Sequence, residues 1–83
     1  MIQIRNLTKG IVLLAEELNF TLTYIMVDDK FLKFTYETDM PDRDMDLLDI
    51  YGAHKNVKQI RCLTRQIPSG FRTAMMVEFE PED

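Results

Sequence analysis

The sequence predicts an α+β fold, a two-layer sandwich in which two helices lie on one face of an antiparallel sheet. Phe20 to Thr38 contains two β-rich runs around a short polar break, which is the pattern of a β-hairpin. The segments on either side of this hairpin have helical periodicity, and Phe71–Glu80 alternates as a strand does. The expected element order is β-α-β-β-α-β-β, a ferredoxin-like arrangement of two split βαβ halves with one added strand.

Length and composition are those of one small globular domain spanning residues 1–83. Hydrophobic residues make up 46% of the 83 positions and charged residues 29%, which excludes the composition typical of disorder. The single cysteine, Cys62, cannot form an internal disulfide, which favours a reducing compartment. The longest apolar run, Ile11–Ala15, is too short to cross a bilayer, and no leader is recognisable at Met1. We therefore expect a cytoplasmic protein without membrane contacts, ending in a frayed acidic tail at residues 81–83.

The first predicted elements are a short strand and an amphipathic helix. Met1–Arg5 alternates isoleucine with polar residues, which indicates a strand. Asn6 or Thr8 can cap the helix that follows, and Asn19 is a plausible end for it. The apolar face of this helix contains Leu7, Ile11, Leu14, Ala15 and Leu18. If Met1–Arg5 is not a strand, the order becomes α-β-β-α-β-β, which is still a two-layer α+β sandwich.

The hairpin turns at Asp28, Asp29 and Lys30. Because side chains alternate across a strand, residues two apart share a face, and a slip of one residue would turn all of them outward. The predicted core-facing sets are Leu22, Tyr24 and Met26 in the first strand and Leu32, Phe34 and Tyr36 in the second.

A second helix is predicted from about Pro41 to Gly52. Proline fits the first turn of a helix, where its missing N–H has no partner to lose, and glycine often ends one. Residues 53–67 are ambiguous, since they fit a helix with one apolar face or a strand. The turn-forming run Ile67–Gly70 and the clear strand that follows favour a strand over residues 56–66, paired with that last strand.

No catalytic, cofactor-binding or metal-ligating residues are predicted, and no cofactor is expected. His54 and Cys62 are the only residues of their types, and nothing in their spacing indicates a nucleophile pair. The alternating aspartates at 42, 44 and 46 resemble the start of a calcium loop. However, Leu47 and Ala53 occupy the positions where such a loop needs glycine and glutamate. Whether the chain is an enzyme stays open, with the balance against it.

The charge pattern is the feature that points to function. From His54 to Ala74 there are five basic residues and no acid, whereas Glu37–Asp49 contains six acids and one base. The five candidates for partner binding are Lys55, Lys58, Arg61, Arg65 and Arg72. We predict a small non-enzymatic interaction or regulatory module that binds a protein partner or a second copy of itself through a sheet edge and this basic window, residues 54–74.

Two other functions fit the same residues. The basic window could contact nucleic-acid phosphates, although Phe71 is the one aromatic residue near it that could stack on bases. The third function, a small-ligand or enzyme module of ferredoxin-like shape, rests on analogy of fold.

Overall fold

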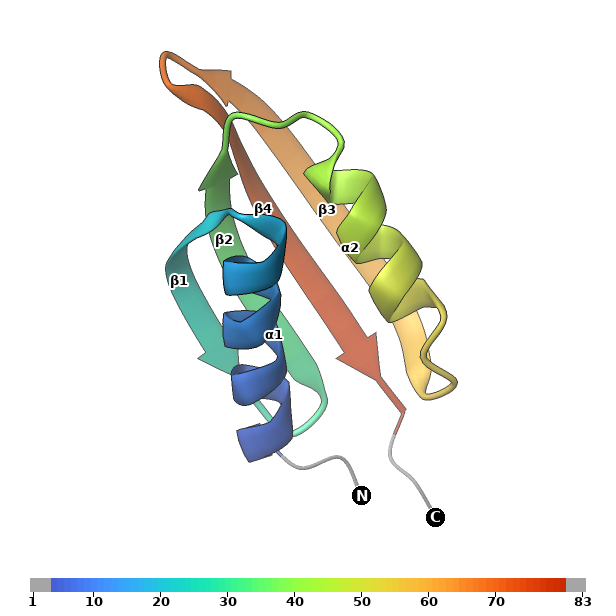
Figure 1. Ribbon diagram of the computed structural model, residues 1–83. Helices are drawn as coiled ribbons and strands as arrows, with labels where there is room; N and C mark the ends of the chain where they lie inside the picture. Colours follow the sequence, from blue (N-terminus) through green and yellow to red (C-terminus); the bar gives the residue numbers. More distant parts are fainter. Residues whose placement is uncertain (1–3, 81–83) are drawn as a thin grey trace.

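The computed structural model describes the backbone of residues 4–80 and the side chains of residues 7–80. Its elements, in chain order, are α1 (Ile4–Leu18), β1 (Thr21–Val27), β2 (Phe31–Thr38), α2 (Arg43–Gly52), β3 (Val57–Ile67) and β4 (Gly70–Phe79). The strands form one antiparallel sheet in the order β1-β2-β4-β3. Both helices lie on the same face of this sheet, α1 near β1 and α2 near β3 (Figure 1). The predicted α+β class is confirmed.

The first predicted strand is wrong, and with it the ferredoxin-like topology. Ile4 and Arg5 open α1, while residues 1–3 lie outside the described part of the chain. Ile4 stands three and seven residues before Leu7 and Ile11, which is the spacing of one helical face, so the helical pattern begins earlier than expected. The order is therefore α-β-β-α-β-β, the stated alternative. Two hairpins lie side by side and join through β2 and β4.

The ambiguous window forms a strand, so the helical alternative for residues 53–67 is wrong. β3 pairs with β4 along its length, and Pro68 and Ser69 form the turn between Ile67 and Gly70. Helical periodicity in this window is overridden because β4, a central strand, needs a hydrogen-bonded neighbour on each side. α2 also forms as predicted and ends at Gly52.

The core lies between the two helices and the central strands. β2 contributes Leu32, Phe34 and Tyr36, so the predicted core-facing set of this strand is confirmed. Other buried apolar residues are Met75, Val77 and Phe79 from β4, Ile11 from α1, Phe20 before β1, and Leu47 and Tyr51 from α2. Burial of each such side chain stabilises the fold by about 1.5–3 kcal/mol.

A β-bulge in β1 overturns the core-facing set predicted for that strand. The pairing register shifts between Leu22 and Tyr24, so that Leu22 faces the core and Tyr24 faces away from it. Ile25 and Val27 then pack against the core, and Met26 lies on the opposite face beside Lys33. One extra residue in a strand reverses the facing of every later side chain, and alternation alone cannot reveal it.

The end of α1 follows the expected chemistry. Asn19 has a φ of +57°, and the backbone N–H of Phe20 donates to the carbonyl of Ala15 over 3.1 Å. A left-handed residue followed by this hydrogen bond is the Schellman ending of a helix, and asparagine tolerates it better than most residues. Within residues 4–80, no helix is long and apolar enough to cross a membrane.

Candidate binding surface

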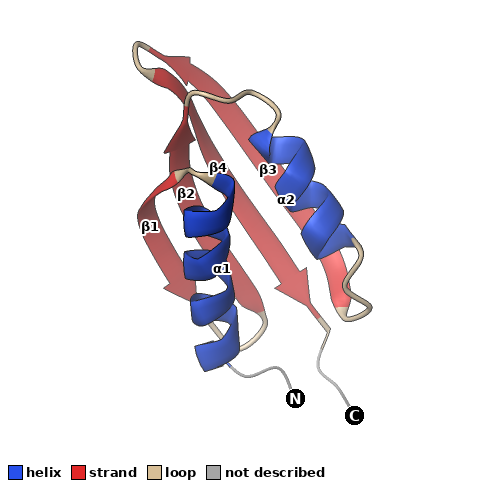
Figure 2. Cartoon of the chain, viewed as in Figure 1, coloured by secondary structure: helices blue, strands red, loops and turns tan. Residues whose placement is uncertain are grey.

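The face of the sheet opposite the helices is the candidate surface, and we call it the open face. No helix or loop of residues 4–80 covers it, because α1 and α2 share the other side (Figure 2). The pairing registers determine which side chains lie on it. They include Tyr24 and Met26 of β1, Lys33, Thr35 and Glu37 of β2, Arg61, Leu63 and Arg65 of β3, and Arg72, Ala74, Met76 and Glu78 of β4.

The middle of the open face is apolar and hollowed. Leu63 is 63% exposed and Tyr24 53% exposed, with the small side chain of Ala74 between their strands. A shallow groove of about 260 Å³ runs from Tyr24 past Ala74 and Met76 to Leu63. A second groove shares Leu63 and Ala74 with the first and extends the hollow toward the arginines. A continuous apolar patch with a polar rim is typical of a surface that binds a partner.

Three of the five predicted basic residues, Arg61, Arg65 and Arg72, lie on the open face. Arg72 is already paired, since its Nε and Nη2 atoms donate to Glu37 Oε2 over 3.2 and 3.0 Å. Lys58 lies at a bulge in β3, where its Nζ is 3.7 Å from Glu78 Oε2. Lys55 lies in the exposed connection before β3 and not within the sheet.

Arg61 and Arg65 are therefore the cations that the fold brings together without neutralising them. Neither has an ion-pair partner among the residues whose side chains are described. They stand two residues to either side of Leu63 in the same strand, so they flank the most exposed apolar side chain of the face. A further cation on the open face, Lys33, was absent from the five predicted residues because it lies outside the basic window. Its pairing opposite Met76, which in turn pairs with Arg61, puts it on the same surface.

Four of the six acids of Glu37–Asp49 lie on the other side of the sheet, whereas Glu37 lies on the open face. Asp42, Asp44, Asp46 and Asp49 belong to α2 or its first turn, and α2 lies on the helical face. The charge segregation seen along the sequence is thus largely kept in space. The aspartates of α2 lie on one side of the sheet, and the arginines of β3 and β4 lie on the other together with Glu37 and Glu78.

Asp44 is the exception among these acids, because it points into the sheet. Its carboxylate accepts hydrogen bonds from the hydroxyls of Tyr36, Thr64 and Thr73, the last over 2.8 Å. Tyr36 and Thr73 are fully buried, so loss of the carboxylate would remove an acceptor from both hydroxyls and leave the Thr73 hydroxyl with its 3.0 Å contact to the Thr64 hydroxyl. Burial and the hydrogen bond to Asp44 raise the pKa of Tyr36 above its usual range. This cluster joins α2 to β2, β3 and β4, and its role is structural.

In the sequence, Asp44 belongs to the acidic run of Glu37–Asp49, and no contact with the sheet was predicted for it. A signal for its burial existed, since Asp44 precedes Leu47 and Tyr51 by three and seven residues and so shares their helical face.

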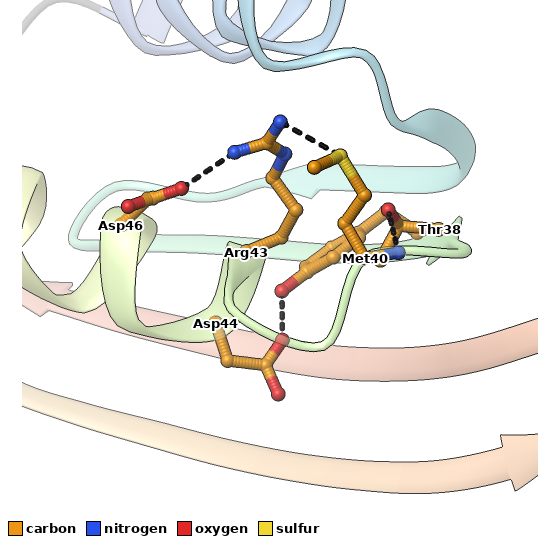
Figure 3. Close-up of polar contacts among 6 residues, drawn as sticks. Thr38, Met40, Arg43, Asp44 and Asp46 are labelled. Atoms are coloured by element: carbon orange, nitrogen blue, oxygen red, sulfur yellow. Dashed lines mark hydrogen bonds and ion pairs between the residues drawn. The ribbon is translucent and has the colours of Figure 1, made fainter.

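Outside the cluster, the side chain of Arg43 contacts residues at the start of α2. Its guanidinium lies between Asp46 and Met40 and donates to Asp46 Oδ2 over 2.7 Å and to Met40 Sδ over 3.0 Å (Figure 3).

The two residues considered for catalysis lie apart in β3 and the connection before it. His54 packs the edge of its ring against Phe79, with 5.7 Å between ring centroids. Cys62 lies in the middle of β3, opposite Met75, and is an exposed residue. Partial burial of its thiol and, secondly, the charge of Asp44 raise the pKa of that thiol. No group of three or more histidine, cysteine or acidic side chains that could hold a metal occurs within residues 4–80.

Comparison of the chain with protein-family models, with curated proteins and with solved structures finds no match in any of the three.

Proposed function

We propose that this protein is an interaction module whose open face binds an acidic protein partner. One observation carries the proposal, namely that Arg61 and Arg65, on either side of the exposed Leu63, have no ion-pair partner among the side chains of residues 7–80. A partner with carboxylates flanking an apolar side chain would neutralise both guanidiniums and cover Leu63. Complementary charge of this kind gives orientation and fast association, and the buried leucine supplies affinity.

The same cations argue against a second copy of the chain as the partner. A symmetric dimer formed through the open face with its two-fold axis near Leu63 would place Arg61 and Arg65 of one copy near those of the other. Like charges in such an interface cost free energy and suppress the wrong pairing. The proposal therefore names a different protein, one that is acidic where it contacts β3.

Charge reversal tests the proposal. Tagged wild-type chain and the double variant Arg61→Glu/Arg65→Glu would be used to capture proteins from the cells in which the protein naturally occurs, with identification by mass spectrometry. We expect an acidic partner that the variant loses. The matched control is Lys9→Glu/Lys30→Glu, which makes the same charge change at exposed positions away from the open face. Equal capture by all three folded chains would contradict the proposal.

Single-stranded nucleic acid is a second candidate, and the position of Tyr24 favours it. The bulge in β1 brings this exposed ring to the face that carries Lys33 and Arg61, and an aromatic ring beside cations is a stacking platform for bases. Phe71, the aromatic residue expected to stack, instead pairs with the buried Thr38 on the helical side. Fluorescence polarisation with labelled single-stranded RNA and DNA tests this function. Binding should weaken with salt and in Tyr24→Ala, and no binding at low salt would exclude it.

A further inference from the structure

The outer edge of β3 presents a row of backbone groups with no strand beside it in the described part of the chain. β3 is the last strand of the sheet, and residues 61–66 are all exposed. Phe79 donates its backbone N–H to Lys30, on the β2 side, whereas the N–H of Glu80 donates to Asn56, on the β3 side, each over 2.7 Å. Even-numbered residues of β4 therefore bond toward β3.

This alternation fixes which residues of β3 face the free edge. Arg61, Leu63 and Arg65 pair with the even-numbered Met76, Ala74 and Arg72, so their backbone groups bond to β4. The residues that alternate with them, Ile60, Cys62, Thr64 and Gln66, direct their N–H and C=O groups outward. An extended peptide beside β3 could hydrogen-bond to this row, which is the strand-addition mode of recognition.

The charges along this edge determine which kind of strand can pair with β3. An antiparallel second copy centred on Leu63 would place Arg61 opposite Arg65 twice, and like charges directly opposite each other destabilise a strand pair. An acidic strand would instead place carboxylates opposite both arginines. These positions are non-hydrogen-bonded pairs on the free side of β3, where opposing side chains come closest.

Resting on the proposed function, we propose that the partner contributes an extended segment that adds to β3 as a fifth strand. Its pattern is acid–x–apolar–x–acid. The two acids lie opposite Arg61 and Arg65, and the apolar residue lies opposite Leu63. The x residues are neutral, because their side chains lie on the side of Cys62 and Thr64, where the Thr64 hydroxyl donates to the Asp44 carboxylate.

Synthetic peptides test this pattern on the full chain. The probe is acetyl-Ser-Glu-Thr-Val-Thr-Glu-Ser-amide. Its control is acetyl-Ser-Thr-Glu-Val-Glu-Thr-Ser-amide, which has the same composition and charge. In the control, the two glutamates and the valine project from opposite faces of the extended peptide. A third peptide carries the probe sequence with both threonine amides methylated, which removes the strand hydrogen bonds and keeps the side chains. Titration calorimetry should show the probe binding about tenfold more tightly than either control.

Amide hydrogen exchange followed by NMR provides the direct readout of strand addition. On binding of the probe, exchange at Cys62 and Thr64 should slow, while the amides of Arg61, Leu63 and Arg65, already bonded to β4, should change little. Arg61→Glu/Arg65→Glu should abolish both effects, and Lys9→Glu/Lys30→Glu should retain them.

The outcomes separate this inference from the proposed function. If the probe fails to bind, or binds no better than its methylated form, strand addition is wrong. If the charge-reversed chain nevertheless loses a captured acidic protein, the open face still binds a partner by another geometry. If neither peptide binding nor protein capture depends on Arg61 and Arg65, both proposals fall.

Discussion

At Gly70 the chain turns from β3 into β4 with a φ of +140°, a backbone conformation that residues other than glycine rarely adopt. A Cβ atom there would lie 2.4 Å from the carbonyl oxygen of Thr38. Gly70→Ala should therefore lower the free energy of unfolding by at least about 1–3 kcal/mol. Gly10→Ala is the matched control, because it lies within α1 with open space around it and should raise stability by about 0.5–1 kcal/mol. Urea denaturation measures both, and equal effects would contradict the assigned turn.

Cys62 gives a pH-dependent test of its surroundings. Burial and, secondly, the Asp44 carboxylate raise the pKa of this thiol above its ordinary value of 9.0. Because the thiolate is the reactive form, alkylation by iodoacetamide should be slower than for free cysteine near neutral pH. The rate should keep rising at pH values where the free thiol has already levelled off. Asp44→Asn removes the negative charge, so it should lower the pKa and speed alkylation at a given pH. A rate profile that matches free cysteine would show that neither influence operates.

In β1, the bulge determines which side chains face the core and which face away from it. Ile25 packs against the core, so Ile25→Ala should destabilise the protein by about 2 kcal/mol, near the lower end for core truncation because the side chain is only partly buried. Tyr24→Ala should change the free energy of unfolding by no more than about 0.5–1 kcal/mol, since the ring is exposed. Chemical denaturation of the two variants gives the comparison. Strict alternation from Leu22 predicts the reverse ranking, so the reverse result would place the bulge elsewhere.

The elements also show how far sequence patterns reach. β2 and β4 were predictable because they bury one face only, so each alternates cleanly. The helices were predictable from their periodicity, although Ile4 and Arg5 were assigned to a strand on an alternation too short to separate the two structures. The bulge was not predictable, since Thr23 and its neighbours satisfy strand propensity in either facing. Of the candidate surface, the basic residues were found from charge alone. The ion pairs of Arg72 with Glu37 and of Lys58 with Glu78 were not predictable, because they depend on contacts between strands.

At the scale of the whole molecule, charge reversal converts β3 into its own proposed ligand. In Arg61→Glu/Arg65→Glu, residues 61–65 would read as acid, cysteine, leucine, threonine, acid, which is the inferred partner pattern. Wild-type and variant chains should each sediment at the 9.8 kDa of one chain. An equimolar mixture should form a heterodimer that salt weakens. Analytical ultracentrifugation measures this, with Lys9→Glu/Lys30→Glu plus wild type as the control mixture. A wild-type dimer would contradict the repulsion argued for β3.

The strand order β1-β2-β4-β3 also sets the order in which the chain can fold. Each hairpin closes through a short turn. Pairing of β2 with β4 closes a much longer loop of chain, which contains α2 and β3. Hairpins form in microseconds, and longer closures are slower because they restrict more chain. The hydroxyl partners of Asp44 come from both hairpins, so the carboxylate can bind all of them only after the hairpins have joined. Asp44→Ala should therefore accelerate unfolding far more than it slows folding, and stopped-flow kinetics in urea would measure the two rates separately.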